Sequence, residues 1–169
     1  MKNACMCRKL QVVYFLILFC STQLAAQNDW IWARCASGGG YSEGFSICSD
    51  NSGNVIITGG FTDSLLYFGS TQLSNADPGG INTDVFVAKY DSVGNLLWAL
   101  SAGGLQNDFA YSVCTNRTDD VILTGYFYSP VINFGSFQLM NSNTTGGTMD
   151  YFIAKIDSNG NVIWAKRAG

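Results

Sequence analysis

The sequence predicts an all-β fold made of two repeated units of 66 residues, and two observations lead to this prediction. The first is a self-match. Residues 31–103 align with residues 97–169 without a gap and are identical at about 30 of 73 positions. Trp32, Trp98 and Trp164 mark the repeat, because 98 − 32 and 164 − 98 both equal 66. The second is that each unit consists of short apolar runs separated by turn-forming residues, which is typical of strands.

Four runs rich in β-branched and aromatic residues recur in each unit. In the first unit they are Phe45–Ser49, Val55–Thr58, Asp84–Tyr90 and Leu96–Ala99, and all are too short for helices. Several are apolar on both faces, which suits a sheet that is covered on both sides. With one hairpin joining the first two runs and another joining the last two, each unit is predicted to be a four-stranded antiparallel meander. This is the blade of a β-propeller.

Turn sequences support the hairpins. They are Asp50–Asn54 (DNSGN), Asp91–Asn95 (DSVGN) and Asp157–Asn161 (DSNGN), while the copy of the first turn departs from the pattern at Asn116–Asp120 (NRTDD). In such a turn Asp accepts hydrogen bonds from the following amides, and Gly takes the positive φ that the return requires. The segments also resemble the start of a calcium loop, but they lack its alternating acids and its distant bidentate Glu. We therefore expect neither a metal nor a cofactor.

Two residue types recur at fixed positions, and each admits two roles. The tryptophans either pack between sheets or form a platform for sugar stacking, and their constant place in the unit favours packing. Lys89 and Lys155 lie in the middle of apolar runs. They either pair with Asp91 and Asp157 or project at an edge, where charge discourages strand addition. Neither role is catalytic.

A long segment separates the second run from the third, at residues 60–83 and 126–149. Apolar residues recur at the same positions in both copies of this segment, within Phe68–Leu73 and 134–139, and we expect them to pack against the blade. The two copies diverge most at the polar tips 75–83 and 141–149. Loops on a rigid scaffold commonly carry recognition, so these tips are candidate binding loops, although they could equally be solvated connectors. The candidate binding residues are Asn75, Asp77, Asn82, Asn141 and Asn143.

Residues 1–26 are predicted to be a cleaved signal peptide. A basic start precedes the apolar run Leu10–Cys20, and Ala25-Ala26 forms a plausible cleavage site. A run of about 11 residues is too short for a membrane span, which needs roughly 20. Acylation of Cys20 is disfavoured by the bulky Phe19 before it. We therefore expect a secreted or cell-surface protein with no membrane span in the mature chain.

The repeat region is then residues 27–169, with copies at about 31–96 and 97–162 and a trailing strand to 169. It carries six basic and twelve acidic residues, a net charge of 6 − 12 = −6. This balance argues against a nucleic-acid partner, which needs clustered Lys and Arg. The absence of histidine from the sequence removes most zinc sites and every Ser-His or Cys-His nucleophile.

Three cysteines, Cys35, Cys48 and Cys114, remain in the repeat region. Cys48 and Cys114 are repeat equivalents. In stacked sheets they would lie about 10 Å apart, beyond the roughly 7 Å between Cα atoms that a disulfide tolerates. We expect small buried hydrophobic residues, with a bridge between Cys35 and Cys48 left open.

The chain resembles the bacterial β-propeller repeats called SBBP repeats. The resemblance rests on GNVIITG at Gly53–Gly59, DVFVAKYD at Asp84–Asp91, GNLLWA at Gly94–Ala99 and the following Ala102-Gly103-Gly104, and it covers essentially all of residues 30–169. It implies exported, often multi-bladed proteins, some of which carry a C-terminal sorting domain for type IX secretion. It supplies no catalytic motif.

Two units are fewer than the four to eight blades, roughly, of a closed propeller. We therefore expect either a fragment of a longer protein or several copies that together complete a ring. The leading functional hypothesis is a non-catalytic scaffold that contacts an extracellular protein or glycan. The alternatives are part of a secreted glycan-active enzyme, which would use paired carboxylates, and a structural spacer in a large adhesin.

Overall fold

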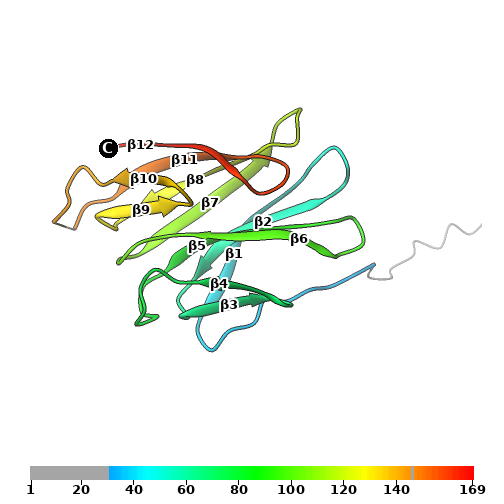
Figure 1. Ribbon diagram of the computed structural model, residues 1–169, viewed down its shortest axis with the longest axis horizontal. Helices are drawn as coiled ribbons and strands as arrows, with labels where there is room; N and C mark the ends of the chain where they lie inside the picture. Colours follow the sequence, from blue (N-terminus) through cyan, green and yellow to red (C-terminus); the bar gives the residue numbers. More distant parts are fainter. Residues whose placement is uncertain (1–30, 146) are drawn as a thin grey trace, which may run out of the picture.

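The computed structural model describes residues 31–145 and 147–169, and these ranges contain strands but no helix (Figure 1). The predicted signal peptide, residues 1–26, lies outside the described residues. The strands are β1 (Ser42–Ser49), β2 (Val55–Phe61), β3 (Leu65–Phe68), β4 (Thr71–Ser74), β5 (Asp84–Tyr90), β6 (Leu96–Ala102), β7 (Asp108–Thr115), β8 (Val121–Phe127), β9 (Val131–Phe134), β10 (Phe137–Met140), β11 (Asp150–Ile156) and β12 (Val162–Ala168).

The strands form two four-stranded antiparallel sheets, β1-β2-β5-β6 and β7-β8-β11-β12, here called blade 1 and blade 2. The prediction of an all-β fold with two four-stranded meanders is confirmed. All four predicted runs are strands, and three of them extend three residues further than predicted. The blades span 42–102 and 108–168, so they begin 42 − 31 = 11 residues later than the predicted sequence copies.

Each long segment between the second and third strands folds into an additional hairpin, β3-β4 in blade 1 and β9-β10 in blade 2. A two-residue turn, Gly69-Ser70, joins Phe68 to Thr71, and Gly69 has a positive φ of 62°. The expected apolar anchors Phe68 and Leu73 are buried, and so is Leu66, which lies outside the predicted range Phe68–Leu73. The hairpin itself is not among the predicted elements.

The turns follow one hydrogen-bonding scheme. In the first, Asp50 Oδ1 accepts from the amides of Ser52 and Asn54, both at 2.9 Å, and Gly53 has a φ of 76°. The turns that begin at Asp91 and Asp157 repeat this scheme. Since the turns' own amides occupy these carboxylates, hairpin formation accounts for the motif.

A core of buried aliphatic and aromatic residues joins the two blades. Ile56, Val85 and Val87 from one face of blade 1 pack with Leu123 and Phe152, among others, from blade 2. A second core on the other face of blade 1 includes the apolar residues of β3 and β4. Because each blade has two apolar faces, stacking one blade on the next buries a face of each.

The tryptophans connect each unit to the turn of the next. Trp98 is half-buried against the inter-blade core, and its indole Nε1 donates to the Ser158 carbonyl at 3.0 Å. A Cβ on Gly160 would approach the indole to 2.9 Å, so glycine permits this contact. Trp32 makes the equivalent contact with Ser92, at 3.1 Å. These contacts support packing as the role of the tryptophans.

Residues 31–37 lie beside blade 1 in the same way as β6 lies beside blade 2. Ser37 bridges to Tyr67 in β3, and its equivalent Gly103 bridges to Asn133 in β9. Residues 31–37 therefore lie like the fourth strand of a preceding blade, but apart from this one bridge they join no sheet among the described residues.

Replacing Trp98 by alanine is expected to lower the free energy of unfolding by about 3 kcal/mol, at the lower end of the range for truncating large aromatic residues, because the indole is half-buried. Urea unfolding measures the change. The control is Trp164→Ala, because among the described residues no following turn hydrogen-bonds the Trp164 indole. Equal losses in the two variants would contradict the inter-blade role of Trp98.

Candidate functional site

Two of the predicted binding residues have structural roles. Asn75 is buried, and its Nδ2 donates to the carbonyl oxygens of Phe61, at 3.2 Å, and Asn82, at 2.9 Å. Asn141 repeats the arrangement in blade 2, donating to Phe127 and Thr148. These two side chains tie each loop to the end of a strand.

The other three predicted binding residues are also engaged within their own loops. Asp77 accepts from the amides of Gly79 and Asn82 and from Asn82 Nδ2. Asn143 accepts from the amide and hydroxyl of Thr145. The loop geometry thus uses most of their hydrogen-bonding capacity, and a binding role for the tips stays a prediction.

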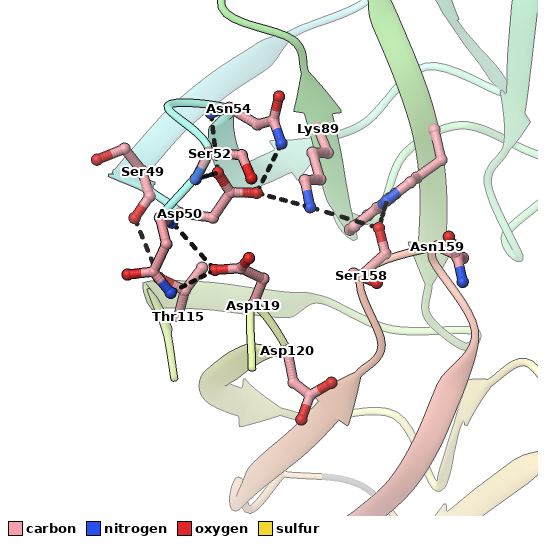
Figure 2. Close-up of polar contacts among 12 residues, drawn as sticks. Ser49, Asp50, Ser52, Asn54, Lys89, Thr115, Asp119, Asp120, Ser158 and Asn159 are labelled. Carbon is pink, nitrogen blue, oxygen red and sulfur yellow. Dashed lines mark hydrogen bonds and ion pairs between the residues drawn. The ribbon is translucent and has the colours of Figure 1, made fainter. Parts of the chain in front are cut away.

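A polar seam joins the blades at the turn end of the strands (Figure 2). At its centre, Lys89 Nζ lies 2.9 Å from Asp50 Oδ2, and the two side chains are only 3% and 1% exposed. Lys89 also donates to the Ser158 carbonyl of blade 2, at 3.4 Å. Of the two roles considered for Lys89, pairing with Asp91 is wrong, because Asp91 accepts hydrogen bonds from its own turn while Asp50 faces the lysine across neighbouring strands. Projection at an edge is wrong too, because β5 lies inside the sheet and the Lys89 side chain is buried.

Further hydrogen bonds cross the seam. Asn51 donates to Asp119 Oδ1 from its side chain, at 2.7 Å, and from its amide, at 3.0 Å. The Thr115 hydroxyl donates to the Ser49 carbonyl at 3.0 Å. Burial raises the pKa of Asp50, but hydrogen bonds from Lys89 and Asn54 and the lysine charge outweigh it and bring the pKa to about 2. Asp50 is therefore a carboxylate at neutral pH.

Blade 2 keeps this pair although its turn departs from the usual sequence. Asn116 takes the place of Asp50, and Asp120 takes the place of Asn54, so the acid and the amide are exchanged. Asn116 Oδ1 accepts from the turn amides, and Asp120 Oδ2 pairs with Lys155 at 2.8 Å. Asp119 stands where the first turn has Gly53, and like that glycine it has a positive φ, here 61°. Pairing of Lys155 with Asp157 is thus also wrong.

Two buried carboxyl groups lie at the opposite ends of the strands. Asp84 begins β5, and its Oδ2 accepts from the Ala76 amide at 2.6 Å, while its buried Oδ1 has no partner among the described residues. Asp108 begins β7 and accepts from the amide and hydroxyl of Ser129. Burial raises the pKa of both groups to about 7, and the charge of Asp108 adds to the effect on Asp84.

An aromatic cluster of five residues spans the first strands of the two blades and β8. Its members are Phe45, Phe109, Tyr111, Tyr126 and Tyr128. Phe45 and Tyr111 stack with centroids 5.1 Å apart, and the hydroxyls of Tyr111 and Tyr126 lie 3.2 Å apart. That hydrogen bond, with burial, raises the pKa of Tyr126 to about 12. Tyr111 is 46% exposed, so the cluster reaches solvent.

Sequence reasoning missed the aromatic cluster, because only part of it repeats. Phe45 and Tyr111 are repeat equivalents, but Phe109, Tyr126 and Tyr128 correspond to Glu43, Gly60 and Thr62. The signal in the sequence that could have indicated the cluster is that the two copies of the repeat differ at these three positions. It shows that the blade does not need aromatic residues there in order to fold.

The cysteines differ from the expectation of small buried residues. Cys48 is half-buried against the inter-blade core, but Cys35 and Cys114 are exposed, and all three are free. The possible bridge between Cys35 and Cys48 is therefore not formed. Burial raises the pKa of the Cys48 thiol, and nearby Cys114 and Asp50 raise it further.

Within residues 31–145 and 147–169, no three His, Cys, Asp or Glu side chains gather where they could hold a metal ion. No helix in this part of the chain is long and apolar enough to cross a membrane. The aromatic cluster is thus a surface feature that could serve recognition, held on a rigid pair of sheets.

Two face-packed four-stranded meanders define a propeller-like repeat protein, and the described residues do not close a ring. An uncharacterized WD repeat-containing protein, L264, of Acanthamoeba polyphaga mimivirus is 28% identical over 135 residues, which is 76% of this chain and 10% of that protein. WD repeats form propeller blades, so this similarity supports the propeller-like assignment.

The regulatory protein FlaEY of Caulobacter vibrioides is 30% identical over 101 residues, 60% of this chain and 10% of that protein. The chain thus spans about a tenth of the length of the curated relatives it matches. No family model matches the chain, so the narrower resemblance to SBBP repeats stays a prediction.

Replacing Lys89 by methionine is expected to lower the free energy of unfolding by about 3 kcal/mol or more, because it leaves the Asp50 carboxylate buried without its partner. Chemical denaturation measures the loss. Lys155→Met is the matched control. Its pair with Asp120 is more exposed and screened by solvent, so the expected loss is clearly smaller than at Lys89. A loss at Lys89 no larger than at Lys155 would contradict the importance of the buried pair.

The melting temperature is expected to fall by a few degrees between pH 5 and pH 8. A carboxyl group with a raised pKa stabilises the folded state below its unfolded pKa of about 4, and this stabilisation is lost as the pH rises through about 7. The aspartates with lowered pKa stay ionised throughout this window. Calorimetry across the pH range measures the slope.

Asp84→Asn should reduce that slope. Asp150→Asn, at the equivalent position in blade 2, should not, because hydrogen bonds from Ser142 and the charge of Arg167 outweigh burial and keep the pKa of Asp150 low. A wild-type melting temperature that stays constant over this range would show that the two buried carboxyl groups do not titrate there.

Proposed function

We propose that this chain is an exported, non-catalytic β-propeller-type scaffold that contacts a protein or glycan outside the cell. Export rests on the signal-peptide pattern of residues 1–26. The scaffold role rests on the stacked repeats. That the scaffold recognises a ligand is inferred from the side chains on its surface, because a fold alone does not specify a function.

The observation that carries the proposal is the aromatic cluster. Tyrosine is enriched in binding interfaces because its ring buries a large area while its hydroxyl still forms hydrogen bonds. Tyr111 and Tyr126 present both features, with ring centroids 5.4 Å apart and hydroxyls 3.2 Å apart. Two sheets joined by a common core hold them, so little conformational entropy is lost when a ligand binds.

The alternative of a glycan-active enzyme requires two carboxyl groups beside a substrate. Asp84 and Asp108 are the two neighbouring carboxyl groups with raised pKa, but both are buried, and their hydrogen-bonding partners belong to the fold. They therefore give the enzymatic alternative no support. A structural spacer differs from the proposal in needing no exposed aromatic cluster.

A glycan array probed with the purified chain tests the proposal, with a binding screen against extracellular proteins as its second arm. Tyr111→Ala is expected to reduce binding by about tenfold or more, as expected for an aromatic contact worth at least about 1.4 kcal/mol. Tyr41→Ala is the control, because Tyr41 is exposed but lies outside the cluster.

A second variant exchanges the loop 75–83 for an unrelated linker of equal length. Loss of binding in this variant, with binding unchanged in Tyr111→Ala, would indicate that the binding site lies at the loop tips and not at the aromatic cluster. Absence of binding in both arms would favour the spacer, and hydrolysis of a polysaccharide would favour the enzyme.

A further inference from the structure

The contact between the blades shows what one face of a blade requires from its neighbour. Ile56, Val85 and Val87 of blade 1 are fully buried, and they pack into the core that covers blade 2. These three side chains project from β2 and β5 on the face that looks toward blade 2. Each has an equivalent 66 residues later.

Blade 1 carries a groove of about 350 Å³ on its opposite face. Its apolar lining includes Trp32, Ala36, Ile47, Val55, Ile57 and Phe86. The equivalents of these residues, 66 positions later, are Trp98 and Ala102 in β6 of blade 1 and Val113, Val121, Leu123 and Phe152 in blade 2. All six belong to or pack on the inter-blade core. The exposures show the difference: Val113 is 5% exposed, whereas its equivalent Ile47 is 66% exposed. On blade 2, the space equivalent to this groove is filled by Ile56, Val85 and Val87 of blade 1.

The matching side chains lie on the outward face of blade 2. Ile122, Tyr151 and Ile153 are the equivalents of Ile56, Val85 and Val87. Tyr151 is 59% and Ile153 is 41% exposed. One chain thus carries both halves of the contact that already exists inside it, a groove on blade 1 and an apolar face on blade 2.

We propose that a second copy of this chain docks its blade 2 into the groove, so that Ile122, Tyr151 and Ile153 repeat the internal contact between copies. The two surfaces differ, so the contact is head-to-tail and closes into a ring if the rotation per copy allows it. Because closed propellers have roughly four to eight blades, a ring would contain about two to four copies. This inference rests on the fold and not on the proposed ligand.

A difference in side-chain size supports this pairing. Phe109 of blade 2 and Gly60 of blade 1 line one small cavity at the internal contact. In the proposed contact Glu43 takes the place of Phe109, and Tyr126 takes the place of Gly60. At the internal contact the large Phe109 thus meets Gly60, and at the proposed contact the smaller Glu43 meets the large Tyr126. The contact adjoins the aromatic cluster at Tyr126.

Docking requires one rearrangement. β12 of the arriving copy and residues 31–37 of the receiving copy are repeat equivalents and need the same place, where Trp32 now donates to the Ser92 carbonyl. β12 pairs with β11 along its length, whereas residues 31–37 form one isolated bridge to β3. Residues 31–37 are therefore the segment that moves.

Sedimentation velocity of residues 27–169 over a range of concentrations tests the proposal. The wild-type chain is expected to associate as the concentration rises, with an oligomer of defined size if the ring closes. Ile47→Asp in the groove and Ile153→Asp on the blade 2 face should each abolish it, and circular dichroism confirms that the variants fold. Ile81→Asp is the matched control, because Ile81 is 80% exposed and lies outside both surfaces.

Mixing the two variants separates head-to-tail docking from non-specific association. The Ile47→Asp chain keeps an intact blade 2 face, and the Ile153→Asp chain keeps an intact groove. An equimolar mixture should therefore form a one-to-one dimer that grows no further. Deleting residues 27–37 should tighten wild-type association. A wild-type chain that stays monomeric, variants that assemble like the wild type, or a mixture that does not pair would overturn the proposal.

Discussion

The structure depends on one constraint: a four-stranded blade with two apolar faces cannot cover them alone. Val85 and Val87 face one side of β5, while Phe86 and Ala88 face the other, and all four are buried. One side is covered by blade 2, and the other is covered in part by the blade's own hairpin β3-β4 and by residues 31–37, which leaves the groove open. Stacking removes apolar surface from water at about 25 cal/mol per Å². The turns, the seam and the tryptophans all serve to hold this stack in register.

Much of this arrangement could be predicted from the sequence, because periodicity and turn chemistry are local. The strands β1, β2, β5 and β6 follow from short apolar runs, and their hairpins follow from Asp and Gly at fixed places. The hairpin β3-β4 was harder to recognise, since each strand has only four residues and alternates weakly. The partner of Lys89 could not be predicted, because choosing Asp50 over Asp91 requires knowing which strands adjoin. The aromatic cluster likewise forms only when β1, β7 and β8 come together.

The aspartates show how surroundings decide the behaviour of one side chain. Asp91 is exposed in a turn, where amide and side-chain donors lower its pKa. Asp50 is buried, but a lysine neutralises it. Asp84 is buried without such a partner, and its pKa is raised to about 7. At the first turn the repeat preserves the ion pair and not the residue identity, since Asn116 and Asp120 exchange acid and amide while one carboxylate still faces the lysine. Asp84 and Asp150 show the opposite case, because the residue is the same while the pKa is raised in one unit and lowered in the other.

The indole of Trp98 lies over a glycine in the next unit, and this contact runs in one direction along the chain. Through its tryptophan a unit covers the second-hairpin turn of its successor, whereas the contacts that reach back to its predecessor are the hydrogen bonds of the polar seam at the first turn. The blades are thus coupled to their nearest neighbours with a polarity, as in linear repeat proteins whose stability is a sum of intrinsic and interfacial contributions. Loss of an early unit exposes the turn that its tryptophan covers in the next unit, whereas loss of the last unit leaves the tryptophan contacts of the earlier units in place.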